Sequence, residues 1–406
     1  MMMNEELIVN DYDLEPGKRI LMGNIAMAEG AIAAGCRLFA GYPITPQNEV
    51  PQHLSKRLPQ VGGRFIQMED EIGSISAVLG ASMAGIKAMT STSGCGFSLM
   101  QESISMAANN EIPCVICDVQ RGGPGSGIVS LPHQSDVMQA HFGGNGEYIL
   151  PTYAPSTCQD LFDFMMDAFN SAETYRVPVI MLSDAFLGHN HEQVIIPTAE
   201  ELNKKIVPRR RVLLNDEGET LDPQRYRPFT YEDSDSEGGY KIPQPPILGT
   251  EYHPNWMPTV THTADSIASE DAIVAKKVNI KLTEKITNNA DKICKNDKHH
   301  LDDSDIAVLC YGLPYRTALK AMRDAREENI KVGIFRMRVV WPLPRKEIKA
   351  LGETVKTILV PEINLGQILE YVNAIVKCDA EVIPVTEIGG LHKPEQILNS
   401  IKEANK

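Results

Sequence analysis

The stretch Arg37-Leu-Phe-Ala-Gly-Tyr-Pro-Ile-Thr-Pro46 joins a short apolar run to a stiff turn that carries a hydroxyl side chain. We predict a strand over residues 37–40, preceded by a helix of small residues over 24–34. Ligands of open parallel sheets bind at the carboxyl ends of the strands, where Thr45 would stand. The same hydroxyl also suits the cap of a helix that starts near Gln47.

The alternation of strands and helices continues to about Pro197. The predicted strands are 64–68, 87–92, 113–119 and 179–182, and the predicted helices are 71–84, 97–109 and 156–175. A second series of strands (306–310, 331–335, 357–361) and helices (317–328, 344–351, 364–376) follows. Such alternation indicates parallel sheets covered by helices, so the predicted fold class is α/β.

Three acids occur together in Gln67-Met-Glu-Asp-Glu-Ile-Gly73, where the helix 71–84 is expected to begin. The positive end of a helix favours acidic side chains, which accounts for all three. Glu71 differs because it directly precedes an apolar stripe, while the opposite face carries small residues that let another surface approach. The stripe is Ile72, Ile75, Leu79 and Met83. A desolvated carboxyl group at Glu71 could keep its proton and donate a hydrogen bond.

Two glycine-rich loops follow predicted strands, Thr90-Ser-Thr-Ser-Gly-Cys-Gly-Phe97 and Gln120-Arg-Gly-Gly-Pro-Gly-Ser-Gly127. Such loops place backbone N–H groups beside a ligand. The first lacks the lysine of a P-loop, which argues against ATP. In the second, the guanidinium of Arg121 suits a carboxylate, although a surface salt bridge is the alternative.

Composition excludes several classes of protein. The chain has 406 residues and a net charge of −14, which argues against nucleic acid as the main ligand. It has no apolar run of about 18 residues, so we expect no membrane span. The acidic residues 1–14 are unlike a signal peptide, so we expect a cytoplasmic protein. Cys114 and Cys117 lie three apart in a predicted strand and would face opposite ways, which favours packing over a cluster site.

These features divide the chain into four parts. We predict an N-terminal extension over 1–22, a first domain over 23–207, an extended connector over 208–300 and a second domain over 301–406. The connector is rich in proline and acidic residues and shows little hydrophobic period before a helix near 271–286. A long ordered loop of this kind is often functional and could cover a site.

Taken together and in this order, the four motifs resemble the α subunit of the 2-oxoacid:ferredoxin oxidoreductases, most closely the 2-oxoglutarate branch. The similarity covers residues 23–197 and resumes over 305–374. It implies a pyrimidine-type thiamine-diphosphate-binding domain followed by a domain like the C-terminal domain of transketolase. It also implies the conversion of a 2-oxoacid, 2-oxoglutarate above all, and CoA to acyl-CoA and CO2, with electrons passing to ferredoxin.

The resemblance assigns roles to single residues. Glu71 matches the glutamate that hydrogen-bonds N1′ of the aminopyrimidine and so helps to activate the thiazolium. Arg121 matches the arginine that holds the substrate's α-carboxylate, and Thr45 would hydrogen-bond the substrate's carboxylate or keto oxygen. The remaining candidates are Tyr42 at the substrate and Ile44, Ser93 and Gly94 at the cofactor.

The resemblance also implies partners. Thiamine enzymes hold Mg²⁺ and the diphosphate with a Gly-Asp-Gly motif, which does not occur in this sequence. In the family this motif lies on a β subunit, together with a 4Fe–4S cluster. We therefore expect half of an active site here, completed by a β subunit. A separate γ subunit and a ferredoxin-like δ subunit are further expected partners.

One departure leaves the substrate open. The 2-oxoglutarate branch usually shows Glu before Gln-Ser-Asp, whereas this chain has His133-Gln-Ser-Asp136. A branched-chain 2-oxoacid or pyruvate is therefore an alternative substrate. Two other classes stay open, namely half of a non-oxidative thiamine-dependent decarboxylase and a non-catalytic scaffold that keeps the fold.

Overall fold

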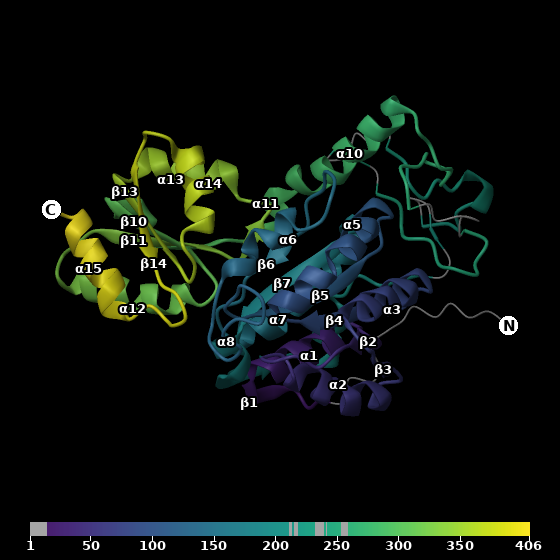
Figure 1. Ribbon diagram of the computed structural model, residues 1–406, viewed down its shortest axis with the longest axis horizontal. Helices are drawn as coiled ribbons and strands as arrows, with labels where there is room; N and C mark the ends of the chain where they lie inside the picture. The colour runs from purple at the N-terminus through teal and green to yellow at the C-terminus, as the bar shows by residue number, and fades with distance from the viewer. Residues whose placement is uncertain (1–13, 211–212, 215–217, 232–238, 241, 253–258) are drawn as a thin grey trace.

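The computed structural model describes residues 14–210, 213–214, 218–231, 239–240, 242–252 and 259–406. Figure 1 shows an N-terminal α/β unit in the centre and a C-terminal α/β unit, in green and yellow, at its left. The long helix α10 (Ala272–Thr287) of the connector runs along the upper side of the central unit. Most of the expected N-terminal extension, residues 1–13, lies outside the described residues.

The N-terminal unit is built on a seven-stranded sheet. Across the sheet its strands are β12 (Val339–Trp341), β6 (Thr152–Tyr153), β7 (Pro178–Asp184), β5 (Cys114–Gln120), β4 (Ala88–Thr92), β2 (Leu38–Gly41) and β3 (Arg64–Gln67). All neighbouring pairs are parallel except β12 with β6. The carboxyl ends of β2, β3, β4 and β5 therefore lie along one edge, which carries every motif that the sequence singled out.

Helices cover both faces of this sheet, as the alternation predicts. They are α1 (Gly23–Ala33), α2 (Glu49–Gln60), α3 (Glu71–Met83), α4 (Gly94–Leu99), α5 (Gln101–Asn109), α6 (Gln139–Phe142), α7 (Cys158–Tyr175), α8 (Ala185–His189) and α9 (Ala199–Asn203). Helices α1 and α7 lie so close that a Cβ at Gly30 would stand 2.4 Å from the carbonyl oxygen of Phe162. Both thiols of the Cys114/Cys117 pair are buried in β5.

Two expectations for these helices are wrong in detail. The helix expected over 97–109 is two helices that meet at Met100. The side-chain amide of Gln101 donates to the carbonyl of Phe97 at 3.1 Å, which an unbroken helix would offer to the backbone N–H of Gln101. In α3, Ile72 does not belong to the buried stripe, because 48% of its surface is exposed. The buried face begins with Glu71 itself.

A two-stranded antiparallel sheet was not predicted. Strand β1 (Gly17–Met22) lies within the expected extension and pairs with β8 (His191–Ile196) along its whole length, from Gly17 opposite Ile196 to Met22 opposite His191. Strand β1 has no fully buried residue, and β8 buries only Val194 and Ile196, so neither has the long apolar pattern that would mark a strand. The pairing ties the start of the described chain to the end of the N-terminal unit.

The C-terminal unit has a five-stranded sheet in the order β14 (Glu381–Thr386), β13 (Thr357–Glu362), β10 (Ile306–Tyr311), β11 (Val332–Met337) and β9 (Asp297–His299). Its helices are α12 (Pro314–Glu327), α13 (Arg345–Thr354), α14 (Gln367–Val376) and α15 (Pro394–Ala404). Strand β12 leaves this unit to complete the other sheet, where the indole N–H of Trp341 donates to the carbonyl of Val137 at 2.7 Å.

The connector is held by buried ion pairs. Helix α10 begins at the predicted place, with the Asp271 carboxylate accepting from the N–H of Ile273 at 2.7 Å. Two lysines of this helix reach Glu111, with Lys281 Nζ 2.6 Å and Lys285 Nζ 3.0 Å from its carboxylate. A short helix, α11 (Ala290–Ile293), follows α10. Within the described residues, no helix has the length and apolar character needed to cross a membrane.

Candidate active site

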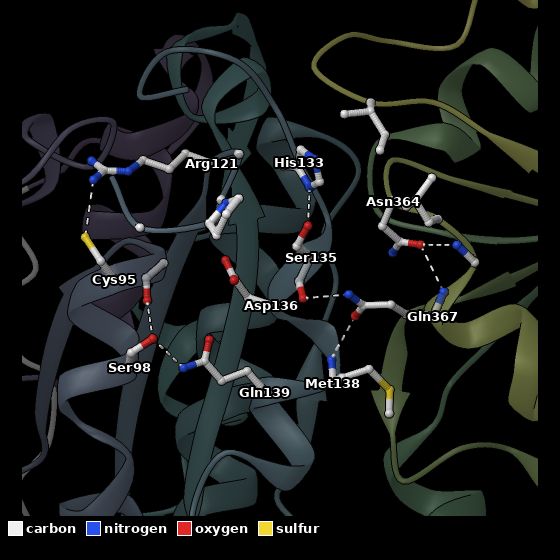
Figure 2. A pocket seen from close by; sticks show the side chains of 18 of the residues that line it. Cys95, Ser98, Arg121, His133, Ser135, Asp136, Met138, Gln139, Asn364 and Gln367 are labelled. Carbon is white, nitrogen blue, oxygen red and sulfur yellow. Dashed lines mark hydrogen bonds between the residues drawn. The ribbon is translucent and has the colours of Figure 1, made fainter. Parts of the chain in front are cut away.

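A cavity of about 910 Å³ opens between the two units (Figure 2). One wall comes from the first residues of α4, the loop that follows β5 and residues 133–139. The other wall comes from residues 364–371 at the start of α14 and from Ile388. The cavity therefore lies at the carboxyl ends of β4 and β5, as expected for an open α/β sheet.

Arg121 brings two of the predicted substrate residues together. It is 6% exposed, and its Nη1 donates to the backbone carbonyl of Thr45 at 2.6 Å. Its Nη2 donates to Cys95 Sγ at 3.3 Å, while its buried Nε has no hydrogen-bond partner among the described residues. The half-buried Thr45 accepts a hydrogen bond from Asn48 through its hydroxyl at 3.4 Å. The guanidinium is thus fixed beside the turn that contains Thr45.

Glu71 is the first residue of α3 and is 5% exposed. Asp70 caps the helix through the N–H of Gly73 at 2.7 Å, which frees the Glu71 side chain to point inward. Its Oε1 accepts from Thr92 Oγ1 at 3.3 Å. A Cβ at Gly96 would lie 2.2 Å from the same oxygen, so this helix position must be glycine if the carboxylate keeps its place.

The first turn of α4 connects these groups. Cys95 contacts the Arg121 guanidinium, and the next residue, Gly96, contacts the Glu71 carboxylate. Glu71 and Arg121, which are far apart in the sequence, therefore meet at one turn, and Thr45 joins them through its hydrogen bond with Arg121. Of these three, only Arg121 lines the cavity.

The remaining candidates lie around the same turn. Ser93 is fully buried immediately before α4, and its hydroxyl has no partner among the described residues. Gly94 lines the cavity, and its N–H donates to Asp118 Oδ1 at 3.0 Å. Tyr42 is 40% exposed and Ile44 is half-buried, and neither of them lines the cavity.

A buried pair of carboxyl groups, Asp118 and Asp136, lies behind this turn and was given no role from the sequence. Burial, together with the neighbouring Asp136, raises the pKa of Asp118 well above its ordinary value. Burial raises the pKa of Asp136 to about 6, against the effects of Asp118 and Arg121. Burial and proximity therefore disfavour the state in which both carboxyl groups are ionised. The sequence feature that could have indicated this site was the position of Asp118 at the end of a predicted strand.

His133 stands in the same cavity, although the sequence marked it only as a departure from a family pattern. It is 6% exposed, and its Nδ1 is hydrogen-bonded to Ser135 Oγ. Burial lowers its pKa, so the imidazole is neutral at neutral pH. A Cβ at Gly122 would lie 3.4 Å from the ring, at van der Waals contact, so the ring stands directly beside the glycine-rich loop.

Two amide side chains hold the opposite wall. Asn364 Oδ1 accepts from the N–H groups of Gly366 at 2.7 Å and Gln367 at 3.0 Å, at the start of α14. The Gln367 amide crosses to the N-terminal unit, accepting from the N–H of Met138 at 3.3 Å and donating to the carbonyl of Ser135 at 3.0 Å (Figure 2). The Gln367 amide thus joins the C-terminal wall of the cavity to the N-terminal wall.

Comparisons with known families agree with this arrangement. Residues 29–241 match the family described as pyruvate flavodoxin/ferredoxin oxidoreductase, thiamine diP-binding. Residues 304–397 match the pyruvate:ferredoxin oxidoreductase core domain II. The two matches fall on the N-terminal and C-terminal α/β units.

Individual relatives are more specific. The 2-oxoglutarate synthase subunit KorA of Methanothermobacter marburgensis is 42% identical over 94% of this chain and 97% of its own length. The ketoisovalerate oxidoreductase subunit VorB of the same organism is 34% identical, over 95% and 97%.

A solved structure is also similar. It is the 2-oxoglutarate:ferredoxin oxidoreductase from Magnetococcus marinus with 2-oxoglutarate, coenzyme A and succinyl-CoA bound. It has a TM-score of 0.87 and 30% identity over 96% of this chain, which spans 66% of that longer chain. The α/β architecture, the matched thiamine-binding domain and these relatives confirm the expectation from the sequence: the chain belongs to the 2-oxoacid:ferredoxin oxidoreductase family, as a subunit of the KorA type.

Proposed function

We propose that this chain is the α subunit of a thiamine-diphosphate-dependent 2-oxoacid:ferredoxin oxidoreductase. The complete enzyme would convert 2-oxoglutarate and CoA to succinyl-CoA and CO2 and pass two electrons to ferredoxin. The observation that carries the proposal is the meeting of Glu71 and Arg121 at the first turn of α4, with Thr45 hydrogen-bonded to Arg121. The KorA-type relatives support the choice of 2-oxoglutarate. The eight free cysteines suit a cytoplasmic enzyme.

The residues around α4 fit the pyrimidine end of thiamine diphosphate. A buried carboxyl group at Glu71 lies against a helix turn that has no Cβ at Gly96, which lets the carboxylate sit at the start of α4, where it could meet a ring nitrogen. The buried Ser93 hydroxyl, which lacks a partner among the described residues, offers an additional polar contact. The cofactor, when bound, supplies a carbon nucleophile and a place for the electrons released by loss of CO2.

The chain's own residues then have separable tasks. Glu71 shares a proton with the ring nitrogen of the aminopyrimidine, which requires a carboxyl group withdrawn from water. Arg121 binds the α-carboxylate, and Thr45 hydrogen-bonds the carboxylate or the keto oxygen. Binding that stabilised the carboxylate too strongly would slow its loss as CO2. The hydrogen bonds from Arg121 to Thr45 and Cys95 already use part of the guanidinium and so moderate that binding.

A partner subunit completes the site in this proposal. The relatives are named as subunits, so the enzyme has several chains. We propose a β subunit that holds Mg²⁺, the diphosphate and a 4Fe–4S cluster, with a separate γ subunit and a ferredoxin-like δ subunit as additional partners. Ferredoxin would accept the electrons.

The proposal is tested by co-purifying the chain with the product of a neighbouring gene that encodes Gly-Asp-Gly and at least four cysteines. We expect the complex to reduce a viologen dye only when CoA and a 2-oxoacid are both present. Release of an aldehyde without dye reduction would instead identify a non-oxidative decarboxylase. A complex that binds no thiamine diphosphate would identify a scaffold.

Replacing Arg121 by alanine should mainly raise the KM for the oxoacid. Loss of hydrogen bonds to a charged group costs about 1.5–3 kcal/mol, equivalent to roughly a 10- to 150-fold increase. Steady-state kinetics of the purified complex measure the effect, with the exposed Arg225 changed to alanine as the control. An unchanged KM in the Arg121→Ala complex would remove the carboxylate-binding role.

A further inference from the structure

The cavity carries basic side chains at two separate places. Among its lining residues, Arg121 and His133 are the basic ones; Arg121 starts the glycine-rich loop that follows β5, and His133 comes six residues after the end of that loop. Figure 2 shows the Arg121 side chain extending toward Cys95, whereas the His133 ring lies above Ser135, toward the C-terminal unit. A molecule with a carboxylate at each end would find one basic partner on each side.

The His133 ring is already oriented for binding. Its Nδ1 is hydrogen-bonded to Ser135 Oγ, and the ring lies beside Gly122, where an added Cβ would stand 3.4 Å from the ring carbon Cδ2. When the Ser135 hydroxyl donates to Nδ1, the ring proton lies on Nε2, for which the described residues record no protein partner. The hydroxyl can also accept from Nδ1, so the same contact suits the protonated ring. The imidazole is therefore a fixed donor that lacks an acceptor.

Several other polar side chains of the cavity are already engaged, whereas the hydroxyl of Tyr371 has no hydrogen bond recorded within the described residues. The side-chain amides of Asn364 and Gln367 are hydrogen-bonded to backbone groups. Gln139 Nε2 donates to Ser98 Oγ at 2.7 Å. The acidic side chains in the lining, Asp136 and Glu370, do not favour an anion. Of the two basic side chains in the lining, His133 is the one that faces the C-terminal wall, and its Nε2 has no partner among the described residues to compete with a second carboxylate.

We propose that His133, although it replaces the Glu usual in the 2-oxoglutarate branch, binds the distal carboxylate of the substrate and makes this enzyme selective for dicarboxylic 2-oxoacids. The inference rests on the proposed function and assigns a substrate class to the same cavity. A bound branched-chain 2-oxoacid would cover the Nε2–H and leave it without an acceptor. Sites built to hydrogen-bond a substrate group reject analogues that lack the group, because their own polar atom is then buried unpaired.

The test uses the complete complex with His133→Leu and His133→Gln. We expect His133→Leu to lower kcat/KM for 2-oxoglutarate about 10- to 100-fold, mainly through KM, and not to lower kcat/KM for 2-ketoisovalerate. His133→Gln keeps an N–H donor and should recover part of the loss. His191→Leu, at an exposed histidine of β8, is the matched control.

Equal losses for both substrates would mean that His133 has a general structural role and would overturn the proposal, as would an unchanged preference. Calorimetric titration of the same complexes with 2-oxoglutarate and 2-ketoisovalerate gives a second readout that does not need turnover. A selective loss of 2-oxoglutarate binding in His133→Leu supports the proposal even in a complex that fails to reduce the dye, an outcome that would overturn the proposed function alone. Melting curves verify that each variant is folded.

Discussion

Changing Glu71 to glutamine should abolish dye reduction by the complete complex while leaving its assembly intact. Glutamine has nearly the same size, so it can occupy the buried space between Thr92 and Gly96. It cannot share a proton with the aminopyrimidine, and proton transfer by a positioned side chain typically contributes about 10²- to 10⁴-fold to a rate. We therefore expect a loss of at least that size in kcat. Stopped assays at saturating CoA and 2-oxoglutarate measure it.

A matched variant separates this effect from a change of charge alone. Glu69 lies two residues earlier and is exposed, so Glu69→Gln makes the same substitution outside the site. Its complex should retain wild-type turnover. Gel filtration and melting temperatures of both complexes report on assembly. If the Glu71→Gln complex turned over like the wild type, Glu71 would have no part in the mechanism.

Changing Glu111 to glutamine should destabilise the chain by about 3–5 kcal/mol, the usual cost of leaving buried charges uncompensated. Burial alone would raise the pKa of this carboxyl group, but Lys281, Lys285 and Arg176 outweigh burial and hold the pKa well below its ordinary value. Without the carboxylate, the two buried ammonium groups face each other unpaired. Chemical unfolding followed by circular dichroism measures the loss.

The control is an ion pair of the same type at the surface. Glu328 and Lys402 are 2.6 Å apart but partly exposed to solvent, and such pairs contribute at most about 1 kcal/mol. Glu328→Gln should therefore shift the unfolding midpoint far less than Glu111→Gln. Equal shifts in the two variants would show that the Glu111 cluster does not hold the connector helix to the N-terminal unit.

The alternation of strands and helices was predictable because it depends on local sequence. Strand β10 is a continuous apolar run, β5 starts as one, and α10 begins at an aspartate that caps it. The periodicity of α3 misled in one respect, because Ile72 fits the stripe by spacing but lies outward. Which face of a helix is buried depends on its neighbours in space, and these are not visible in the periodicity.

The candidate site could be predicted by residue but not by geometry. Motif order pointed to Thr45, Glu71 and Arg121, yet nothing in their spacing indicates that α4 brings them together. The Asp118–Asp136 pair and the inward position of His133 also depend on contacts between distant segments. Such contacts arise only when the strands take their order in the sheet, which differs from their order in the chain.

That difference has a consequence for biosynthesis. The edge of the N-terminal sheet next to β6 is covered by β12. This strand is translated only after the whole connector and after strands β9, β10 and β11 of the C-terminal unit. Domains usually fold as they leave the ribosome, the N-terminal one first. Until β12 has been synthesised, the N-terminal half of the nascent chain has one unpaired sheet edge, and unpaired edges promote aggregation. We therefore expect the chain to depend on chaperones during synthesis, because the last strand of this sheet is made long after the others.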